Sequence, residues 1–442
     1  MKIANKEELS RTSRRKDVLE ILEEGLKAAD PKSSVKEALR NLKDELNKAR
    51  RIIVIGFGKA SIKMAEGCEE ELRDKIYDGA IIAPKGIEDK KLKIIKVFEG
   101  THPIPSEVNV ESAKKLISVC SNLTSEDLVI CLISGGGSSL LTFPANDISL
   151  EEKKLTTDVL LKSGADIREI NTIRKHISKV KGGQLLNLLK PAKVVSLILS
   201  DVVGDPIEYI ASGPTSPDSS TFKDALSIIK KYNLVNKLPK SVVERIEKGV
   251  RGEILETPKP GDEIFNNVKN IIVSNNMKSL VAMEKKASSL GYNTIILTSY
   301  AQGESREVGK FLCAVIKQIS SYDIPIKKPA CVILGGETTV TVKGNGKGGR
   351  NQELVLSVVL NCKDVKNFVF ASIGSDGIDG YTDAAGAIAD NFSLEDAVNS
   401  GLKPEEFLEN NDSYNFFKQT RDLIFTGPTG TNVNDFTVAL IF

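Results

Sequence analysis

The chain has 442 residues, 40% of them hydrophobic and 27% charged, which is typical of a globular protein with more than one domain. Its formal net charge is only +2, so there is no global field that would attract nucleic acid or an anionic membrane. The amino terminus is highly charged and no apolar run reaches the length of a membrane span. We therefore expect neither a signal peptide nor a transmembrane helix, and we place the protein in the cytoplasm.

The cysteines and histidines predict neither a disulfide framework nor a zinc site. The six cysteines include no C-x-x-C pair, and three of them lie in apolar runs, where a thiol behaves as a small hydrophobe. The only histidines, His102 and His176, are far apart in the sequence. We interpret His102 as a loop residue bonded to the backbone. His176 lies in a basic segment that we interpret as the exposed face of a helix, unless it faces a binding crevice; its cations include Arg174, Lys175, Lys179 and Lys181.

Two helices are predicted before the first strand. Apolar residues at spacings of three and four give residues 12–29 a helical stripe, and Pro31 ends it. Ser34 and Glu37 then have the spacing of a capping box, so a second helix is expected from there to about Ala49.

The first predicted strand, residues 52–55, ends in the glycine loop 56–61. This pattern suggests a dinucleotide site, but Ser61 stands where the third glycine would be, and the next strand, 79–83, is followed by no ribose-binding acid. Lys59 lies where a helix begins and can add its charge to backbone N–H groups already directed at an anion. We therefore predict an anion site formed by Gly56, Gly58 and Lys59.

The next buried strand, residues 128–133, ends in a loop of glycines and serines. Such a loop can wrap a phosphate or a carboxylate with N–H donors at little steric cost. Ser138 is followed two residues later by Leu140, so the pattern of a nucleophilic serine elbow is absent. The residues that we predict to bind substrate or phosphate here are Ser134, Gly135, Gly136, Gly137, Ser138 and Ser139.

A further strand, residues 194–199, leads to Asp201. A carboxylate at a strand tip can coordinate Mg²⁺ or accept a proton, although an N-cap or a turn would explain it as well. The Pro- and Gly-containing run that ends at Gly261 is the best linker candidate. We therefore predict an amino-terminal domain of residues 1–255 and a carboxy-terminal domain of residues 256–442.

The second domain contains the most informative stretch, residues 331–360. A short buried strand is followed by two glycines and Glu337. Next comes a loop with more glycines and two cations, and the apolar segment after this loop is either a buried helix or a strand. Cations among bare backbone N–H groups near a helix start favour phosphate. The residues that we predict to bind it are Gly335, Gly336, Lys347, Gly348, Gly349 and Arg350.

The strand at 368–372 ends in a turn with Asp376, Asp379 and Asp383, which suggests a hard cation. The calcium-loop pattern fails, because the twelfth position from Asp376 is Ala387, so magnesium shared with phosphate oxygens is favoured. Ligands bind at the carboxyl ends of strands in open α/β sheets, and the five strand-end loops therefore predict one crevice.

Taken together, these strings resemble the glycerate 2-kinases of the MOFRL type over nearly the whole chain. The strings that carry the resemblance include GFGKAS at 56–61, THPIPSE at 101–107, SGGGSS at 134–139, NTIRKHIS at 171–178, SDVVGDP at 200–206, GGETTV at 335–340, GKGGRNQE at 346–353 and GSDGIDG at 374–380.

The resemblance implies an α/β fold with two domains and an active site in the cleft between them. The amino-terminal domain would be a Rossmann-like doubly wound sheet, and the carboxy-terminal α/β domain would be smaller. It also implies Mg²⁺-dependent phosphorylation of D-glycerate by ATP to give 2-phosphoglycerate. In that family the residues matching Lys59 and Arg350 are implicated in catalysis.

From residue chemistry we expect Lys59 and Arg350 to neutralise the transferring phosphoryl group, and Asp201 to orient the 2-hydroxyl or accept its proton. Magnesium would be held by Asp201, Glu337 or Asp376. The partners expected are therefore D-glycerate and ATP, without nucleic acid or membrane, and a homodimer is a candidate assembly.

Two alternatives stay open. One is an NAD(P)H-dependent hydroxypyruvate reductase, and the other is a non-catalytic sensor of a phosphorylated acid. A P-loop enzyme is excluded, because Lys347 precedes a glycine rather than Ser or Thr.

Overall fold

A computed structural model describes residues 1–86 and 92–442, which form two compact units. We call Pro31–Ser200 with Asp205–Val273 the central unit. The carboxy-terminal unit combines Met1–Asp30, Asp201–Gly204 and Ser274–Phe442. These units divide the chain differently from the boundary at 255 and 256 that the linker pattern predicts, because the first thirty residues pack with the end of the chain.

The central unit is built on a six-stranded sheet in the order β3-β2-β1-β4-β5-β6. Each pairing from β3 through β5 is parallel. This is the strand order of the dinucleotide-binding doubly wound fold, so the predicted Rossmann-like sheet is confirmed. The strands are β1 (Ile52–Phe57), β2 (Ile76–Pro84), β3 (Ile95–Gly100), β4 (Leu128–Ile133), β5 (Lys193–Leu199) and β6 (Val268–Ser274). The strand β6 lies within residues 256–442, the predicted second domain, yet it is an edge strand of this central sheet.

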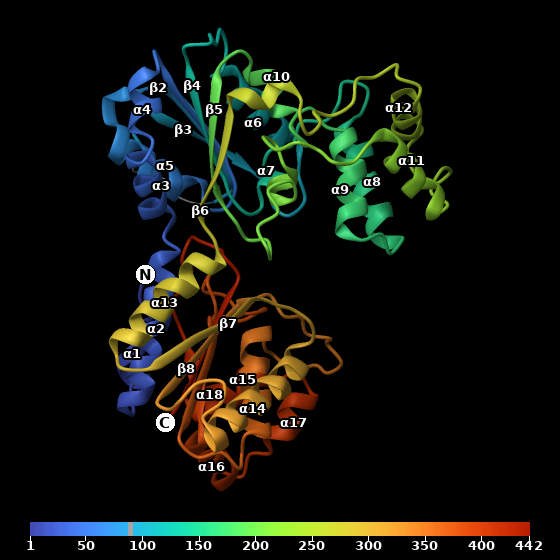
Figure 1. The fold of residues 1–442 in the computed structure, drawn as a ribbon. Coiled ribbons are helices and arrows are strands. Elements are labelled where there is room, and N and C mark those ends of the chain that lie inside the picture. The colour runs from blue at the N-terminus through green and yellow to red at the C-terminus, as the bar shows by residue number, and fades with distance from the viewer. Residues whose placement is uncertain (87–91) are drawn as a thin grey trace. The chain divides into compact units, whose positions relative to one another are not determined.

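Helices cover both faces of the central sheet (Figure 1). One face carries α3 (Pro31–Arg40), α4 (Lys43–Lys48) and α5 (Ser61–Leu72), and the other carries α6 (Glu107–Ser118) and α10 (Leu185–Leu189). The helix expected from Ser34 to Ala49 is thus two helices, the first of which begins at Pro31, where proline is tolerated in a first turn. The short α7 (Gly137–Leu140) follows β4, and 3₁₀ turns lie at Arg73–Lys75, Ile210–Ser212 and Glu263–Asn267.

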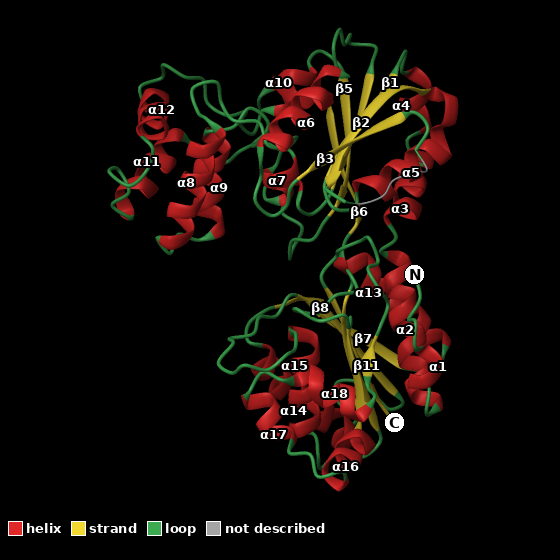
Figure 2. Ribbon diagram, turned by 180° about the vertical axis from the view of Figure 1, so that it is seen from behind, coloured by secondary structure: helices red, strands yellow, loops and turns green. Residues whose placement is uncertain are grey.

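Four further helices form a separate bundle beside the central sheet (Figure 2). They are α8 (Leu150–Lys162), α9 (Ile167–His176), α11 (Phe222–Lys231) and α12 (Lys240–Val250). Their shared core includes the buried side chains of Ile173, Phe222 and Ile246. The bundle therefore has a hydrophobic core of its own.

The carboxy-terminal unit has a mixed six-stranded sheet in the order β11-β10-β9-β12-β8-β7. Its last strand runs antiparallel to both of its neighbours, β8 and β9, whereas β7 and β8 are parallel. The strands are β7 (Asn293–Ala301), β8 (Ala330–Gly336), β9 (Phe368–Gly374), β10 (Gly386–Asp390), β11 (Leu423–Ile424) and β12 (Asp435–Ile441). The sequence analysis missed β3, β10 and β11, which carry weaker apolar patterns.

The helices of this unit also lie on both faces of its sheet. The long helices α2 (Ser13–Ala28) and α13 (Asn276–Ser289) pack on one face, while α14 (Ser305–Tyr322) and α15 (Arg350–Asn361) pack on the other. The helix interpretation of the segment after Arg350 is therefore confirmed. Shorter helices are α1 (Lys6–Leu9), α16 (Asn391–Asn399), α17 (Pro404–Glu409) and α18 (Ser413–Thr420).

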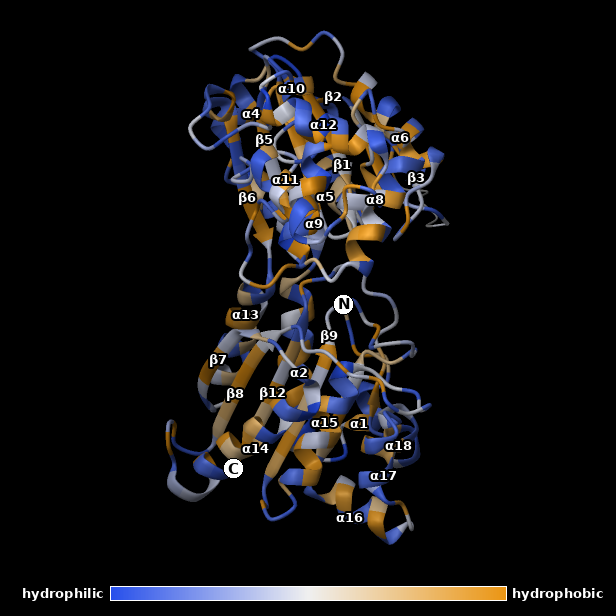
Figure 3. Cartoon of the chain, turned by 90° about the vertical axis from the view of Figure 1, so that its right-hand side faces the viewer, coloured by the Kyte–Doolittle hydropathy of each residue, from blue (hydrophilic) through white to orange (hydrophobic). Residues whose placement is uncertain are grey.

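The cores lie where the strands are apolar. Every residue of β8, β9 and β12 is buried, and Figure 3 shows these strands mainly in apolar colours. Among the residues that the structure describes, no helix combines the length and the apolar character needed to cross a membrane.

A buried ion pair explains why the amino-terminal helices belong to the carboxy-terminal unit. The guanidinium of Arg15, on α2, donates to Asp390 at 2.6 Å, to Asp422 at 2.8 Å and to the hydroxyl of Ser393 at 2.7 Å. Arg15 is 1% exposed, so its charge depends on these carboxylates.

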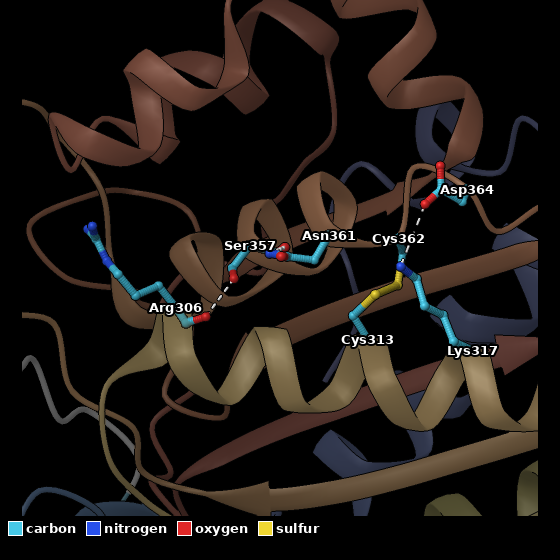
Figure 4. The surroundings of a disulfide bond; sticks show 7 residues. All are labelled: Arg306, Cys313, Lys317, Ser357, Asn361, Cys362 and Asp364. Carbon is cyan, nitrogen blue, oxygen red and sulfur yellow. Dashed lines mark hydrogen bonds and ion pairs between the residues drawn. A yellow bond between two sulfur atoms is a disulfide. The ribbon is translucent and has the colours of Figure 1, made fainter.

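A disulfide joins Cys313 on α14 to Cys362 at the end of α15 (Figure 4). Closer to the start of α14, the hydroxyl of Ser357 on α15 donates to the carbonyl of Arg306 at 2.6 Å and forms a second link between the two helices. The sequence analysis did not foresee this bond, because its two cysteines are separated by 49 residues and nothing local pairs them. The disulfide therefore fixes α15, the helix that begins at Arg350, to its neighbour.

Replacing both cysteines, as Cys313→Ala with Cys362→Ala, should lower the free energy of unfolding by about 2–4 kcal/mol, because the cross-link restricts the unfolded chain. Chemical denaturation measures the change. A reductant should destabilise the wild-type protein by a similar amount and leave the double variant unaffected. Equal sensitivity of both proteins to the reductant would contradict the prediction.

Candidate functional site

The loops after β1 and β4 lie against each other at one edge of the central sheet. The backbone N–H of Lys59 donates to the carbonyl of Gly135 at 2.8 Å, and the N–H of Ala60 donates to the hydroxyl of Ser134 at 3.1 Å. Gly58 has φ +127°, and a Cβ there would meet Ser134. The structure therefore places Gly58 and Lys59 against Ser134 and Gly135, whereas Gly56 lies within β1 opposite Leu132, and the binding of an anion by these residues stays a prediction.

Lys59 and His102 lie side by side at this edge. A Cβ at Gly136 would be 3.2 Å from Cγ of Lys59 and 3.1 Å from Cδ2 of His102. Partial burial, together with the nearby Lys59, lowers the pKa of His102, so the imidazole is mainly neutral near pH 7. Nothing in the local sequence around His102 indicated that it would lie beside Lys59.

Ser138 is held by two cations from the basic segment. Its hydroxyl accepts from Nη2 of Arg174 at 2.7 Å and from Nζ of Lys181 at 3.0 Å, and Lys181 also donates to its carbonyl at 2.6 Å. Lys175 is buried as well and pairs with Asp218 at 3.1 Å. The interpretation of these residues as exposed helix charges is therefore wrong for Lys175, near the end of α9, and for Lys181, in the turn that follows that helix, because both side chains are buried.

The segment after β5 carries Asp201. It lies in Asp201–Gly204, a stretch that packs with the carboxy-terminal unit although β5 belongs to the central unit. A Cβ at Gly204 would lie 3.0 Å from Cε1 of Tyr300 on β7. The role of Asp201 as base or metal ligand stays a prediction.

In the carboxy-terminal unit, Arg350 is held by two carboxylates. Its Nε and Nη2 donate to the two oxygens of Asp435 at 2.7 and 3.0 Å, and Nη1 donates to Glu337 at 2.9 Å. Burial opposes the charge of Arg350, but Asp435 and Glu337 outweigh it and raise the pKa of the guanidinium. Arg350 is therefore permanently charged and fixed in orientation.

Asp435 was not among the predicted site residues. It opens β12 and lies in register with Gly336 at the end of β8 and with Gly374 at the end of β9. Burial raises the pKa of Asp435 to about 6, although the contact with Arg350 opposes that rise. The only sign of Asp435 in the sequence is its position as the first residue of an apolar strand.

The start of α15 is occupied by a protein carboxylate. The backbone N–H groups of Asn351 and Gln352 donate to Asp379 at 3.0 and 2.9 Å. Asp379 is 1% exposed, and burial raises its pKa against the effect of these amides. The backbone N–H groups that the sequence suggested for phosphate therefore already donate to Asp379. An anion bound at this place would have to contact cationic side chains such as Arg350 instead.

The glycines near Arg350 have a packing role. A Cβ at Gly335 would meet the side chain of Asn276, at Gly336 the backbone of Ala301, and at Gly349 the side chain of Asp379. Glycine is therefore needed at these positions by the fold itself, whether or not a phosphate binds there.

The candidate metal ligands Glu337 and Asp376 each use one oxygen within the fold. Glu337 accepts from Arg350, and Asp376 accepts from the N–H of Ile378 at 3.1 Å. Asp376 also lies near Asp435, since a Cβ at Gly374 would be 3.2 Å from the former and 3.6 Å from the latter. No group of three potential metal ligands gathers among the described residues. One or two carboxylates with an open oxygen suit Mg²⁺ that is shared with phosphate.

Lys347 is placed differently from Arg350. Its Nζ lies 4.1 Å from the centre of the Tyr414 ring, and its backbone N–H donates to Asp412 at 2.8 Å.

The five predicted loops follow strands of two different sheets. Three of them follow strands of the central sheet, and two follow strands of the carboxy-terminal sheet.

Two family models match the chain. A domain described as a domain of unknown function (DUF4147) matches residues 17–247, and the MOFRL family matches residues 330–435.

Curated relatives match over nearly the full length. The chain is 41% identical to the D-glycerate 2-kinase of Thermotoga maritima, covering 97% of this chain and 99% of the relative. It is 43% identical to the glycerate 2-kinase of Pyrococcus horikoshii, covering 96% of each. A putative hydroxypyruvate reductase of Agrobacterium vitis is 37% identical, covering 97% of this chain and 95% of the relative.

A solved structure has the same fold. The crystal structure of glycerate kinase from Thermotoga maritima superposes with a TM-score of 0.90 at 41% identity, covering 97% of this chain and 99% of that one.

The pKa of Asp435 predicts an acidic limit to turnover. As the pH falls below about 6, Asp435 gains a proton and its hold on Arg350 weakens, so we expect kcat to fall. A pH–rate profile measures this. In Asp435→Asn the acidic limb near pH 6 should disappear and kcat should be low throughout; an unchanged limb in that variant would assign the titration to another group.

Proposed function

The chain belongs to the glycerate 2-kinase family, and on that premise we propose that it transfers the terminal phosphoryl group of ATP to the 2-hydroxyl of D-glycerate. The observation that carries this proposal is the similarity to glycerate kinases over nearly the whole chain. The product would be 2-phosphoglycerate and ADP.

Phosphoryl transfer depends mainly on positioning and on cations around the moving charge. We propose that Lys59 and Arg350, one from each unit, neutralise the transferring group. The bidentate contact of Arg350 with Asp435 supports this role, because it orients the remaining guanidinium edge before substrate binds. Lys59 is exposed beside Gly136, so its ammonium group is accessible to a phosphate.

The acceptor hydroxyl must lose its proton as the new O–P bond forms. We propose that Asp201 orients this hydroxyl and accepts the proton, since it follows a strand end of the kind that supplies catalytic residues in α/β folds. The proposal rests on residue chemistry and chain position.

Magnesium is part of the same proposal. Asp201, Glu337 and Asp376 are the residues that would hold it, and Glu337 and Asp376 each keep one carboxylate oxygen that accepts no hydrogen bond from the described residues. When bound, the ion would offset negative charge on the nucleotide phosphates. The predicted binding roles of Lys347, Gly348 and Gly349 toward the nucleotide belong to this proposal too.

We further propose a cytoplasmic location, because ATP is supplied there, and a homodimer as the assembly to be tested by light scattering.

The name of the Agrobacterium vitis relative supports one rival, reduction of hydroxypyruvate by NAD(P)H. Against it, Ser61 replaces the third glycine of a dinucleotide loop, and its hydroxyl donates to the carbonyl of Ile82 at 3.2 Å. The strand β2 ends at Pro84 without an acid for the ribose. Oxidation of NADH on addition of hydroxypyruvate would support the rival.

The reaction is tested by incubating the protein with ATP, Mg²⁺ and D-glycerate and recording a phosphorus NMR spectrum. The spectrum distinguishes 2-phosphoglycerate from 3-phosphoglycerate. Formation of ADP without any phosphoglycerate would contradict the proposal, whereas the absence of any glycerate-dependent release of ADP would favour a sensor of phosphorylated acids.

Replacing the cation of the carboxy-terminal unit, as Arg350→Ala, should lower kcat by about a thousandfold, on the scale of other phosphoryl-transfer arginines. A coupled ADP assay measures the loss. Arg40→Ala, which removes an exposed arginine paired with Glu71 in the central unit, is the matched control and should retain activity. Near-normal kcat in Arg350→Ala would remove Arg350 from the mechanism.

A further inference from the structure

Two cations, Arg174 and Lys181, contact Ser138 inside the central unit, and Lys153 lies close enough to them for its charge to lower the pKa of Lys181. Lys153, on α8, is 2% exposed and Lys181 is 1% exposed. Arg174, on α9, is partly exposed, but its Nε is buried without a hydrogen-bond partner. Arg174 and Lys181 both donate to the Ser138 hydroxyl. We call Lys153, Arg174 and Lys181 the buried cation cluster.

The structure describes no carboxylate paired with the cluster in residues 1–86 and 92–442. Among residues 1–86 and 92–442, none of its three members forms an ion pair with a carboxylate, and Lys153 has no side-chain hydrogen bond either. Their polar partners there are Ser138 and Asn171. A buried charge without a partner is costly, so the cluster is poorly compensated by the protein alone.

Other buried cations of this chain are paired. Arg15 contacts Asp390 and Asp422, and Lys175, one residue from Arg174, contacts Asp218. In both of these places a buried cation is neutralised by a carboxylate of the protein itself. The buried cation cluster differs from these two residues in having no carboxylate partner among the described residues.

Burial and mutual repulsion both lower the pKa values of the two lysines of the cluster. Burial, and then the charge of Arg174, lowers the pKa of Lys153 to about 7. Burial, with Arg174 and Lys153, also lowers the pKa of Lys181. An anion bound among them would restore the charged forms.

The cluster adjoins the part of the loop that carries Lys59. Ser138 is two residues from Gly136, whose Cβ position is 3.2 Å from Cγ of Lys59, and two residues span at most about 7 Å. An anion held at Ser138 would thus lie within the length of a small substrate from Lys59. The near-complete burial of two of the cations favours a small group over a triphosphate.

We propose that Lys153, Arg174 and Lys181, with Ser138, form a buried oxyanion site that binds the carboxylate of the three-carbon acid substrate. The proposal rests on the proposed function and adds the residues that select an acid. It predicts that the enzyme discriminates against an uncharged polyol of the same size, since glycerol would leave the cations unpaired.

The sharpest test is Lys153→Met, because Lys153 has no hydrogen-bond partner among the described residues whose loss would disturb the fold. We expect the KM for D-glycerate to rise about tenfold or more, as for loss of a charged contact, with the KM for ATP changed less than about twofold. Lys154→Met, one residue along the same helix and paired with exposed Glu151, is the matched control and should leave both constants unchanged. A tenfold rise in the KM for ATP with an unchanged KM for glycerate would assign the site to nucleotide phosphate and overturn the proposal.

Thermal unfolding supplies a second readout. Without ligand, Lys153→Met should have a Tm equal to or above that of the wild type, because it removes an uncompensated buried charge, whereas Lys175→Met should lower Tm by leaving Asp218 unpaired. D-glycerate should raise the Tm of the wild type and have little effect on Lys153→Met. A lower Tm in Lys153→Met together with an unchanged KM for glycerate would mean that the cluster is structural.

The same measurement separates failure of this inference from failure of the proposed function. If the wild-type protein makes no phosphoglycerate, the kinase proposal fails, but a Tm rise with D-glycerate that is absent in Lys153→Met still supports a carboxylate site. If inorganic phosphate raises the Tm and D-glycerate does not, the site takes phosphate and the carboxylate assignment is wrong. If neither anion changes the Tm of the wild type, the oxyanion site is overturned.

Discussion

Parallel pairing of β1 with β4 is the constraint on which the central unit depends. The register places Phe57 beside Ile133, so the loops that follow these residues leave the sheet at the same edge. The backbones there approach so closely that only glycine fits at position 58, next to Ser134. Lys59 and the loop 134–139 are neighbours for this reason, although about seventy-five residues separate them in the sequence. The function proposed for Lys59 therefore rests on hydrogen bonds between strands.

The antiparallel strand β12 has the corresponding role in the other unit. Its first residue, Asp435, lies between the ends of β8 and β9, where it meets Arg350 at the start of α15. The carboxylate orients the guanidinium and compensates its charge, and Asp379 satisfies the amides of the helix start. The charge of Arg350 is therefore compensated, and its side chain is oriented, in the absence of a ligand.

The two units treat positive charge differently, and the difference bears on function. Arg350 is neutralised by Asp435 and Glu337, so it is ordered before substrate arrives. The cations around Ser138 have no carboxylate among the described residues, so they gain most from an anion that binds. An oriented cation such as Arg350 can stabilise the charge of a transition state, whereas the cations around Ser138 can bind the carboxylate of an acid in the ground state.

Local sequence patterns were enough to indicate the class of fold and the location of the glycine loops, because strands and helix starts follow from apolar periodicity and from glycine. They also indicated Lys59 and Arg350, through motifs within a few residues of each. The tertiary structure alone shows that Asp435 holds Arg350, that Cys313 bonds Cys362, that residues 1–30 belong with the end of the chain, and that Lys175 and Lys181 are buried. These facts depend on which groups are desolvated together by chain segments far apart, and no local pattern encodes the charge that a buried group meets across the fold.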